Sequence, residues 1–152
     1  MLNFTFELNG QPMSALKGAG RSYPAFSGLG SYVNRRSTVC TPSKGAIPPG
    51  DYLIVDRESG GFFSTLRDIP KGKIFWYALY RIDKRIDDYL WCNEVKRGNF
   101  RLHPLFFGRG VSLGCITLPS MVDYFYLMTM IRYNGKSSYK GTIGAYGKIT
   151  VK

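Results

Sequence analysis

Short runs of aromatic and β-branched residues, each bounded by glycine or proline, dominate this chain and limit what it can fold into. Its 152 residues include 18 glycines and 8 prolines, and runs of this kind between turn-forming residues are typical of β-strands. Near the start, Phe4, Phe6 and Leu8 alternate with polar residues. The Asn9–Gly10 pair that follows favours a hairpin turn. The sequence therefore predicts a mainly β chain that begins with a β-hairpin.

Further strands are predicted along the rest of the chain. Residues 52–55 form an apolar run after a loop closed by two prolines, which indicates a buried strand. The runs 74–82 and 88–95 are aromatic and β-branched, and the charged residues 83–87 between them predict a second hairpin. The weakly alternating tail, residues 140–152, is expected to close the sheet. The glycine-rich stretch from the first hairpin to residue 50 is expected to be mostly loop.

One segment has the pattern of a helix. Pro119 ends the preceding run, Ser120 is suited to cap a helix, and Asp123 stands where a capping-box acid is expected. The helix is predicted to end at Asn134–Gly135, and its apolar residues surround the axis, so it should be largely buried. The expected fold class is mainly β (α+β), a single domain over residues 1–152 with one principal helix.

The strongest bias in the composition is positive charge. Lys and Arg total 21 against 10 acidic residues, a formal net charge of +11, which favours an anionic partner such as nucleic acid, anionic lipid or bacterial cell wall. The basic residues occur in short clusters without a long basic tail, and no RNP sequence or zinc-finger pattern is present. A basic nucleic-acid-binding domain and a nonenzymatic cell-wall-binding module stay open as alternatives to an enzyme.

The beginning of the chain lacks a basic segment followed by an apolar one, and no window is apolar enough to span a bilayer. We therefore expect a protein made in the cytoplasm without a signal peptide and without stable membrane insertion. One histidine and three scattered cysteines do not supply the ligands of a usual metal site. No metal and no cofactor are predicted. Cys40 and Cys92 are expected to pack in the core, although a bridge between them is left open.

Cys115 is the cysteine whose surroundings indicate chemistry. It lies between Gly114 and a strand-like Ile-Thr-Leu run, and a glycine-rich loop containing Ser112 precedes it. Glycines allow backbone N–H groups to be aimed at a ligand, as an oxyanion beside a nucleophile requires. A thiol with an ordinary pKa of about 8.5 also needs a base at neutral pH. His103 is the only histidine, and two adjacent strands joined by the loop would place its imidazole beside the thiol.

Arg101 and Arg109 flank this segment. A guanidinium group can hold a carboxylate with two parallel hydrogen bonds, so both arginines are candidate substrate-binding residues. Three large aromatic residues elsewhere are expected to fill the core rather than to bind sugar: Tyr52, Trp76 and Trp91.

These residues carry a resemblance to known enzymes. His103 followed by "SLGC", which ends at Cys115, resembles the signature of L,D-transpeptidases. More closely, "RGNFRLHP" and "GVSLGCITL", with "FELNG", "FSGLG", "GAIPPGDYLIVDR" and "IDDYLW", resemble the L,D-transpeptidase-like antibacterial effectors of type VI secretion, the Tlde family. Three features depart from ordinary L,D-transpeptidases: Leu113 replaces a second histidine, the His-to-Cys spacing is shorter, and Pro104 follows the histidine.

The resemblance implies an L,D-transpeptidase-like antiparallel β-sandwich with one principal helix. It also implies a toxin with cysteine-dependent L,D-carboxypeptidase and D-amino-acid exchange activity on peptidoglycan tetrapeptide stems, acting through a thioester. In that reading Cys115 is the nucleophile and His103 the acid–base, with its ring oriented by the Pro104 carbonyl. Gly114 and Cys115 supply oxyanion N–H groups, and Ser112 orients the loop or the imidazole.

The same resemblance implies particular partners and a place of action. The partners are the stem peptides of peptidoglycan, the type VI secretion machinery that delivers the protein, and a cognate immunity protein that protects the producing cell. The protein would act in the periplasm of the target cell.

Overall fold

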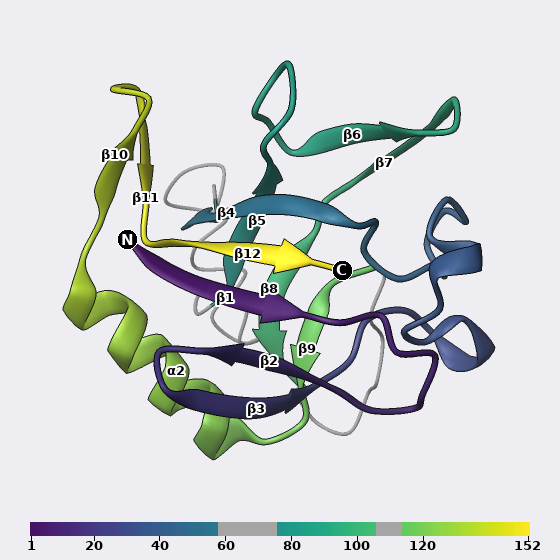
Figure 1. The fold of residues 1–152 in the computed structure, drawn as a ribbon, viewed down its shortest axis with the longest axis horizontal. Helices are drawn as coiled ribbons and strands as arrows, with labels where there is room; N and C mark the ends of the chain where they lie inside the picture. Colours follow the sequence, from purple (N-terminus) through teal and green to yellow (C-terminus); the bar gives the residue numbers. More distant parts are fainter. Residues whose placement is uncertain (58–75, 106–113) are drawn as a thin grey trace, which may run out of the picture.

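The computed structural model describes residues 1–57, 76–105 and 114–152 of the chain. Eight strands form one sheet in the order β3-β2-β1-β12-β4-β5-β8-β9 (Figure 1). Their bounds are β1 Leu2–Phe6, β2 Ser14–Gly18, β3 Arg21–Ala25, β4 Gly50–Asp56, β5 Tyr77–Arg81, β8 Arg101–Pro104, β9 Ile116–Leu118 and β12 Gly147–Val151. The mainly β class with one principal helix is confirmed.

The two ends of this sheet approach each other. Phe26, just after β3, and Thr117 in β9 form an antiparallel bridge in which each N–H donates to the other carbonyl, at 3.0 and 2.9 Å. The sheet is therefore nearly closed, as a barrel is. Most neighbouring strands are antiparallel, as expected, but β1 pairs with β12 and β8 pairs with β9 in parallel. The parallel β8–β9 pair matters most, because it carries the candidate site.

The first hairpin is confirmed, and its side chains alternate as the sequence predicted. Phe4, Phe6 and Leu8 are buried, and β1 pairs with β2 in an antiparallel register. The connection is longer than a two-residue turn and spans residues 7–13. A second tight hairpin, from β2 to β3, turns at Ala19–Gly20 with positive φ at both residues. The stretch expected to be loop thus contains β3, which includes a proline at the end of the sheet.

The buried strand predicted at residues 52–55 is β4, and the strands predicted around 74–82 and 88–95 are β5 and β6 (Tyr89–Cys92). The predicted pairing of the last two is wrong. β5 lies between β4 and β8, whereas β6 pairs with β7 (Val95–Gly98) in a separate two-stranded sheet. The turn between β6 and β7 is Asn93–Glu94, where both residues have positive φ, as tight hairpin turns require. Figure 1 shows this hairpin extending away from the main sheet.

Helix α2, Met121–Asn134, begins where the sequence predicted, and the N–H of Asp123 donates to the Ser120 hydroxyl at 3.1 Å. Its buried face packs Tyr124, Leu127 and Ile131 into the core, and the Tyr124 hydroxyl donates to the Leu102 carbonyl of β8 at 3.1 Å. The expectation of a largely buried helix is wrong, because the sheet covers only one side. Large apolar side chains stay exposed on the other side: Val122, Phe125, Tyr126 and Tyr133.

The remaining elements complete the rim of the sheet. They are the 3-10 helices η1 (Gly30–Tyr32) and η2 (Arg36–Thr38), and the small hairpin of β10 (Ser137–Tyr139) and β11 (Ile143–Ala145). Cys40, after η2, forms a disulfide with Cys92 at the end of β6, with Cα atoms 5.3 Å apart. This bridge replaces the expected packing of two free thiols. No helix within the described ranges is long and apolar enough to cross a membrane.

Candidate active site

His103 lies in β8, and Cys115 immediately precedes β9, the adjacent parallel strand. His103 stands directly opposite Thr117 in the parallel register. Cys115 comes immediately before Ile116, the first residue of β9, so the chain leads from the thiol directly into the strand that pairs with the strand of His103. The sequence predicted two adjacent strands here, and β8 and β9 are paired as expected. Residues 106–113 of the loop that joins them lie outside the described residues.

The imidazole of His103 is buried and held on three sides. Its Nδ1 lies 2.8 Å from the carbonyl oxygen of Pro104, which can only accept, so Nδ1 carries the proton. Its Nε2, the basic nitrogen in this tautomer, lies 3.3 Å from the Thr117 hydroxyl. The ring of Trp76 stacks on the imidazole with centroids 4.1 Å apart and an angle of 18°. These three contacts fix the orientation of the imidazole, with Nε2 facing Thr117.

The thiol of Cys115 is enclosed in the resting protein. Its side chain is 6% exposed, and its Sγ lies 3.8 Å from the backbone carbonyl oxygen of Asn99. Burial raises the pKa of the thiol from its ordinary value of 9.0 to about 11, while the Arg101 backbone hydrogen bond and the charges of Arg101 and Arg97 act in the opposite direction. The thiol is therefore protonated at neutral pH and requires a base before it can act as a nucleophile.

Gly114 occupies a position that no other residue fits without strain. Its φ is +89°, and a Cβ atom there would lie 2.5 Å from Nη2 of Arg97 and 2.9 Å from the ring of Phe100. The Gly114 carbonyl accepts a hydrogen bond of 3.2 Å from the Ser27 hydroxyl. The backbone that leads into Cys115 is thus fixed from outside the loop.

A buried polar network supports this contact. The Ser27 hydroxyl also accepts from the N–H of Ile47 at 2.8 Å, and the Ser27 N–H donates to the side-chain oxygen of Asn34 at 2.9 Å. Both side chains are fully buried, so their hydrogen bonds are stronger than at the surface and their loss more costly. Sequence reasoning did not assign a role to Ser27 or Asn34. The only signal was the position of Ser27 within the "FSGLG" segment.

Arg97 is a buried cation beside this backbone, and sequence reasoning missed it as well. Its side chain is 4% exposed, and its guanidinium donates to the carbonyls of Val39, Gly45 and Ala46. No carboxylate pairs with it in the described part of the chain. Burial lowers its pKa, and the nearby Tyr52 and Cys115 act in the opposite direction. A guanidinium in this place favours negative charge on the neighbouring thiol.

The other predicted site residues divide into two groups. Arg101 lies beside Cys115, but its guanidinium already holds Asp88 through two hydrogen bonds of 2.6 Å. A substrate carboxylate would have to displace or share this partner, and the substrate-binding role of Arg101 stays a prediction. Ser112 and Arg109 lie outside the described residues.

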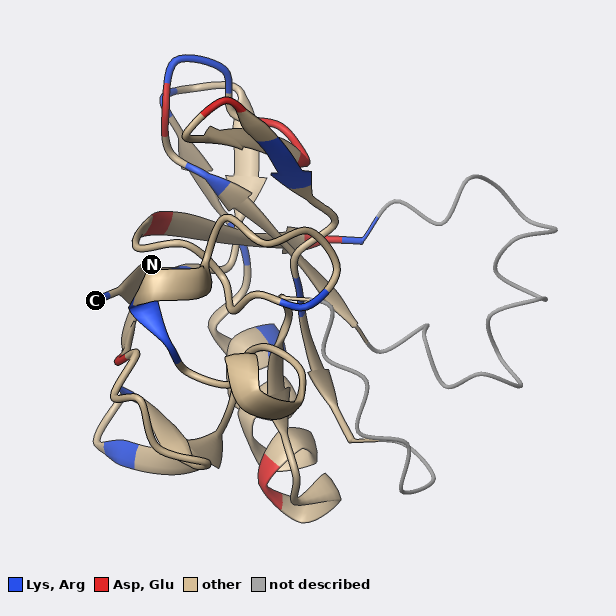
Figure 2. Cartoon of the chain, turned by 90° about the vertical axis from the view of Figure 1, so that its right-hand side faces the viewer, with Lys and Arg blue, Asp and Glu red and all other residues tan. Residues whose placement is uncertain are grey.

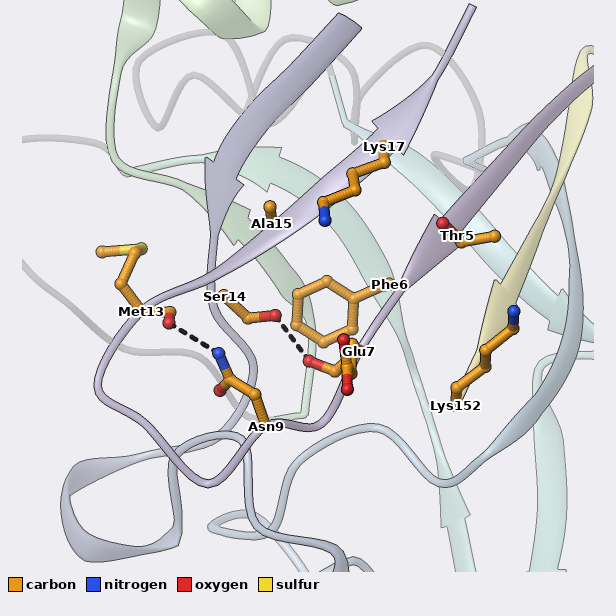
Figure 3. A pocket seen from close by; sticks show the side chains of 9 residues that line it. All are labelled: Thr5, Phe6, Glu7, Asn9, Met13, Ser14, Ala15, Lys17 and Lys152. Carbon is orange, nitrogen blue, oxygen red and sulfur yellow. Dashed lines mark hydrogen bonds between the residues drawn. The ribbon is translucent and has the colours of Figure 1, made fainter.

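A pocket elsewhere on the molecule is separate from this cluster. It measures about 280 Å³ and lies over β1 and β2, where Lys17 and Lys152 line it together with Thr5 and Glu7. Figure 3 shows its rim tied by hydrogen bonds from Asn9 to the Met13 carbonyl and from Ser14 to the Glu7 carbonyl. Neither His103 nor Cys115 lines it.

Comparison with known families gives one result. A family model described as the Tlde1 domain matches residues 21–142, a range that contains Ser27, Arg97, His103 and Cys115. No curated protein and no solved structure matches the chain significantly.

Proposed function

The chain belongs to the Tlde1 domain family, and we propose that it is an antibacterial toxin of type VI secretion that cuts peptidoglycan tetrapeptide stems. The activity we infer is that of a cysteine-dependent L,D-carboxypeptidase that also exchanges the terminal D-amino acid. The single observation that carries this proposal is the buried His103, fixed by the Pro104 carbonyl on the strand next to Cys115. A base of defined tautomer beside a protonated thiol is the arrangement that nucleophilic cysteine chemistry needs.

In the first half of the reaction, Sγ of Cys115 attacks the carbonyl carbon that precedes the terminal D-alanine. The thiol proton passes to Nε2 of His103, either directly or through the Thr117 hydroxyl, which lies 3.3 Å from that nitrogen. The tetrahedral intermediate collapses, the C–N bond breaks, and His103 returns the proton to the leaving amine. A thioester to Cys115 and free D-alanine result.

In the second half, the thioester is resolved by one of two nucleophiles. His103 takes a proton from water or from the amine of a D-amino acid, which attacks the thioester carbonyl, and the thiol leaves with a proton. Water gives a tripeptide stem, which is the carboxypeptidase outcome. A D-amino acid gives a stem with a new fourth residue, which is the exchange outcome.

Negative charge develops on Sγ and then on the carbonyl oxygen, and two features of the site favour it. The N–H groups of Gly114 and Cys115 are the proposed oxyanion donors, held in place by the contact between the Gly114 carbonyl and Ser27. The buried guanidinium of Arg97 adds positive potential from the other side of Gly114.

Acidic residues lie among the basic ones in part of the molecule: Figure 2 shows Asp and Glu beside Lys and Arg in the upper hairpin region. A nucleic-acid-binding surface instead gathers its basic residues along one face, so this mixture favours the cell wall over nucleic acid as the anionic partner. We propose delivery into the periplasm of the target cell, an oxidising compartment in which the Cys40–Cys92 disulfide is stable.

The proposed immunity protein would close the site from outside. An acidic partner that covers the region of His103 and Cys115 would match the excess of basic residues by charge. Stable complexes of this kind typically bury well over 1,000 Å² in total.

Product analysis tests the proposed activity. Purified protein is incubated with a disaccharide tetrapeptide, and the products are separated by liquid chromatography and weighed by mass spectrometry. We expect loss of one D-alanine, and in the presence of D-methionine a product in which methionine replaces that alanine. Cleavage of another bond, or no change in any peptidoglycan stem, would contradict the proposal.

A further inference from the structure

The outer face of the β6–β7 hairpin exposes two aromatic rings. Trp91 is 70% exposed and Tyr89 is 46% exposed, and both lie on one face of β6 because they are two residues apart. The expectation that Trp91 fills the core is therefore wrong, while Tyr52 does lie in the core. Leu90, between the two rings, points the other way and is buried. Two large aromatic rings exposed on one face of a strand form an apolar patch, and such patches can mark binding sites.

The hairpin that carries Trp91 is held rigidly from its inner face. Leu90 packs into the main core, Cys92 is joined to Cys40 by the disulfide, and Arg97 donates to three backbone carbonyls of the segment 39–46. These contacts fix the backbone of the strand that carries the exposed ring of Trp91. A ligand that binds to it does not have to order the strand first.

The neighbours of Trp91 leave its ring open. Tyr89 lies over Gly98, its partner across the hairpin, and the Lys96 ammonium lies 4.2 Å from the centroid of the Tyr89 ring. Lys96 itself is the residue directly opposite Trp91. The face therefore combines an accessible indole with an adjacent positive charge, which suits a ligand that joins an apolar ring face to an anionic group.

The base of this hairpin reaches the candidate site. The N–H of Asn99 donates to the Asp88 carbonyl at 3.0 Å, and the carbonyl oxygen of Asn99 lies 3.8 Å from Sγ of Cys115. Trp91 is three residues farther along the strand than Asp88, which corresponds to about 10 Å at the rise of a β-strand. The exposed ring therefore lies about three extended residues beyond Asp88, which is linked through Asn99 to the thiol, and the distance from the ring to the thiol is longer than about 10 Å.

We propose that Trp91 is a stacking platform for a sugar ring of the peptidoglycan glycan strand, and this inference rests on the proposed function. The scissile bond follows the third residue of the stem, so three residues and the lactyl group that joins them to the sugar separate this bond from the sugar ring, a span of more than about 10 Å. A stem bound at Cys115 that extends along the hairpin therefore carries its sugar toward Trp91. Lys96 lies in position to pair with a carboxylate of that stem.

A binding experiment tests the platform without turnover. Sedimentation of the protein with purified sacculi is measured in a Cys115→Ala background, for Trp91→Ala and for the matched control Tyr133→Ala, which removes an aromatic ring that is 93% exposed on α2. We expect about fivefold to tenfold weaker binding for Trp91→Ala, the range of one aromatic stacking contact. Tyr133→Ala is expected to bind like its parent. Equal binding by both variants would overturn the platform.

A kinetic experiment locates the contact on the sugar. The ratio of kcat/KM for the disaccharide tetrapeptide to kcat/KM for the free tetrapeptide is measured in wild type, Trp91→Ala and Tyr133→Ala. We expect the ratio to fall about fivefold to tenfold in Trp91→Ala alone. An unchanged ratio would overturn the glycan assignment. A wild-type protein that binds sacculi through Trp91 but cuts neither substrate would instead overturn the proposed function and leave the platform standing.

Discussion

The Nδ1 atom of His103 lies 2.8 Å from the carbonyl oxygen of Pro104, the next residue on β8. The acceptor belongs to the backbone, so it fixes the tautomer without help from a second side chain. This contact directs the basic Nε2 toward Thr117 on β9, the strand that begins immediately after Cys115. Because the Pro104 carbonyl orients the ring, a second histidine is not needed for this purpose, and residue 113 is a leucine.

Loss of the imidazole should disable the chemistry without unfolding the protein. His103→Ala is expected to lower kcat on a tetrapeptide stem by at least about a hundredfold, the usual contribution of general acid–base catalysis. Release of D-alanine provides the rate, and a thermal melt provides the control for folding. A folded variant that retains a rate within fivefold of wild type would contradict the role assigned to His103.

Gly114→Ala should be more destabilising than an equivalent change at another left-handed glycine. Gly20 has a φ of +75°, and no atom lies within 4 Å of the place that a Cβ would take there, so Gly20→Ala isolates the backbone strain, about 1 kcal/mol. At Gly114 the methyl group also meets Arg97 and Phe100, and we expect a loss of at least about 2 kcal/mol. Urea denaturation of the two variants measures the difference. Equal losses of stability would contradict the expected clash between a Cβ atom at residue 114 and the side chains of Arg97 and Phe100.

The disulfide should contribute strongly to stability. Cys40 and Cys92 are 52 residues apart, and closing a loop of this length in the unfolded chain corresponds to about 4 kcal/mol in the chain-entropy description. We expect dithiothreitol to lower the urea midpoint of the wild type. The double variant Cys40→Ser, Cys92→Ser should have the urea midpoint of the reduced wild type, both with and without dithiothreitol. A wild-type midpoint that ignores the reductant, with the thiols shown to be free, would contradict this expectation.

The buried thiol should make stability fall at alkaline pH. Burial raises the pKa of Cys115 from 9.0 to about 11, so the folded state holds the proton more tightly than the unfolded state. Its contribution is complete below pH 9 and is lost as the pH rises to 11. A shift of this size corresponds to roughly 3 kcal/mol. Denaturation of wild type and Cys115→Ala at pH 8, 9.5 and 11 measures it. The two should converge as the pH rises, and a constant difference would contradict the burial of an ionisable thiol.

Local sequence patterns were sufficient for some elements because those elements depend on near neighbours. The cap at Ser120 and the alternation of Phe4, Phe6 and Leu8 are set within a few residues, and both were predicted correctly. Cys115 and His103 were identified because one histidine and one glycine-flanked cysteine leave few choices. His103 lies in β8 and Cys115 immediately precedes the adjacent strand β9, and their catalytic roles stay a prediction.

Other features depend on contacts between distant segments, and no local pattern contains them. β5 pairs with β8 rather than with β6, so Tyr77 lies opposite Leu102 instead of a residue of the next strand along the chain. The contact of Ser27 with Gly114 joins residues 87 positions apart. Trp91 was expected in the core because tryptophan is usually buried, but the hairpin turns that side of β6 outward.

The exchange reaction of Cys115→Ala shows whether Cys115 is the nucleophile of both reactions. Wild type, Cys115→Ala and the disulfide variant Cys40→Ser, Cys92→Ser are each incubated with a disaccharide tetrapeptide and D-methionine, and both products are quantified by mass spectrometry. Only Cys115 can form the thioester that hydrolysis and exchange share. We expect folded Cys115→Ala to make neither the tripeptide nor the methionine stem, whereas the folded disulfide variant should make both. Turnover by folded Cys115→Ala would contradict this role of Cys115.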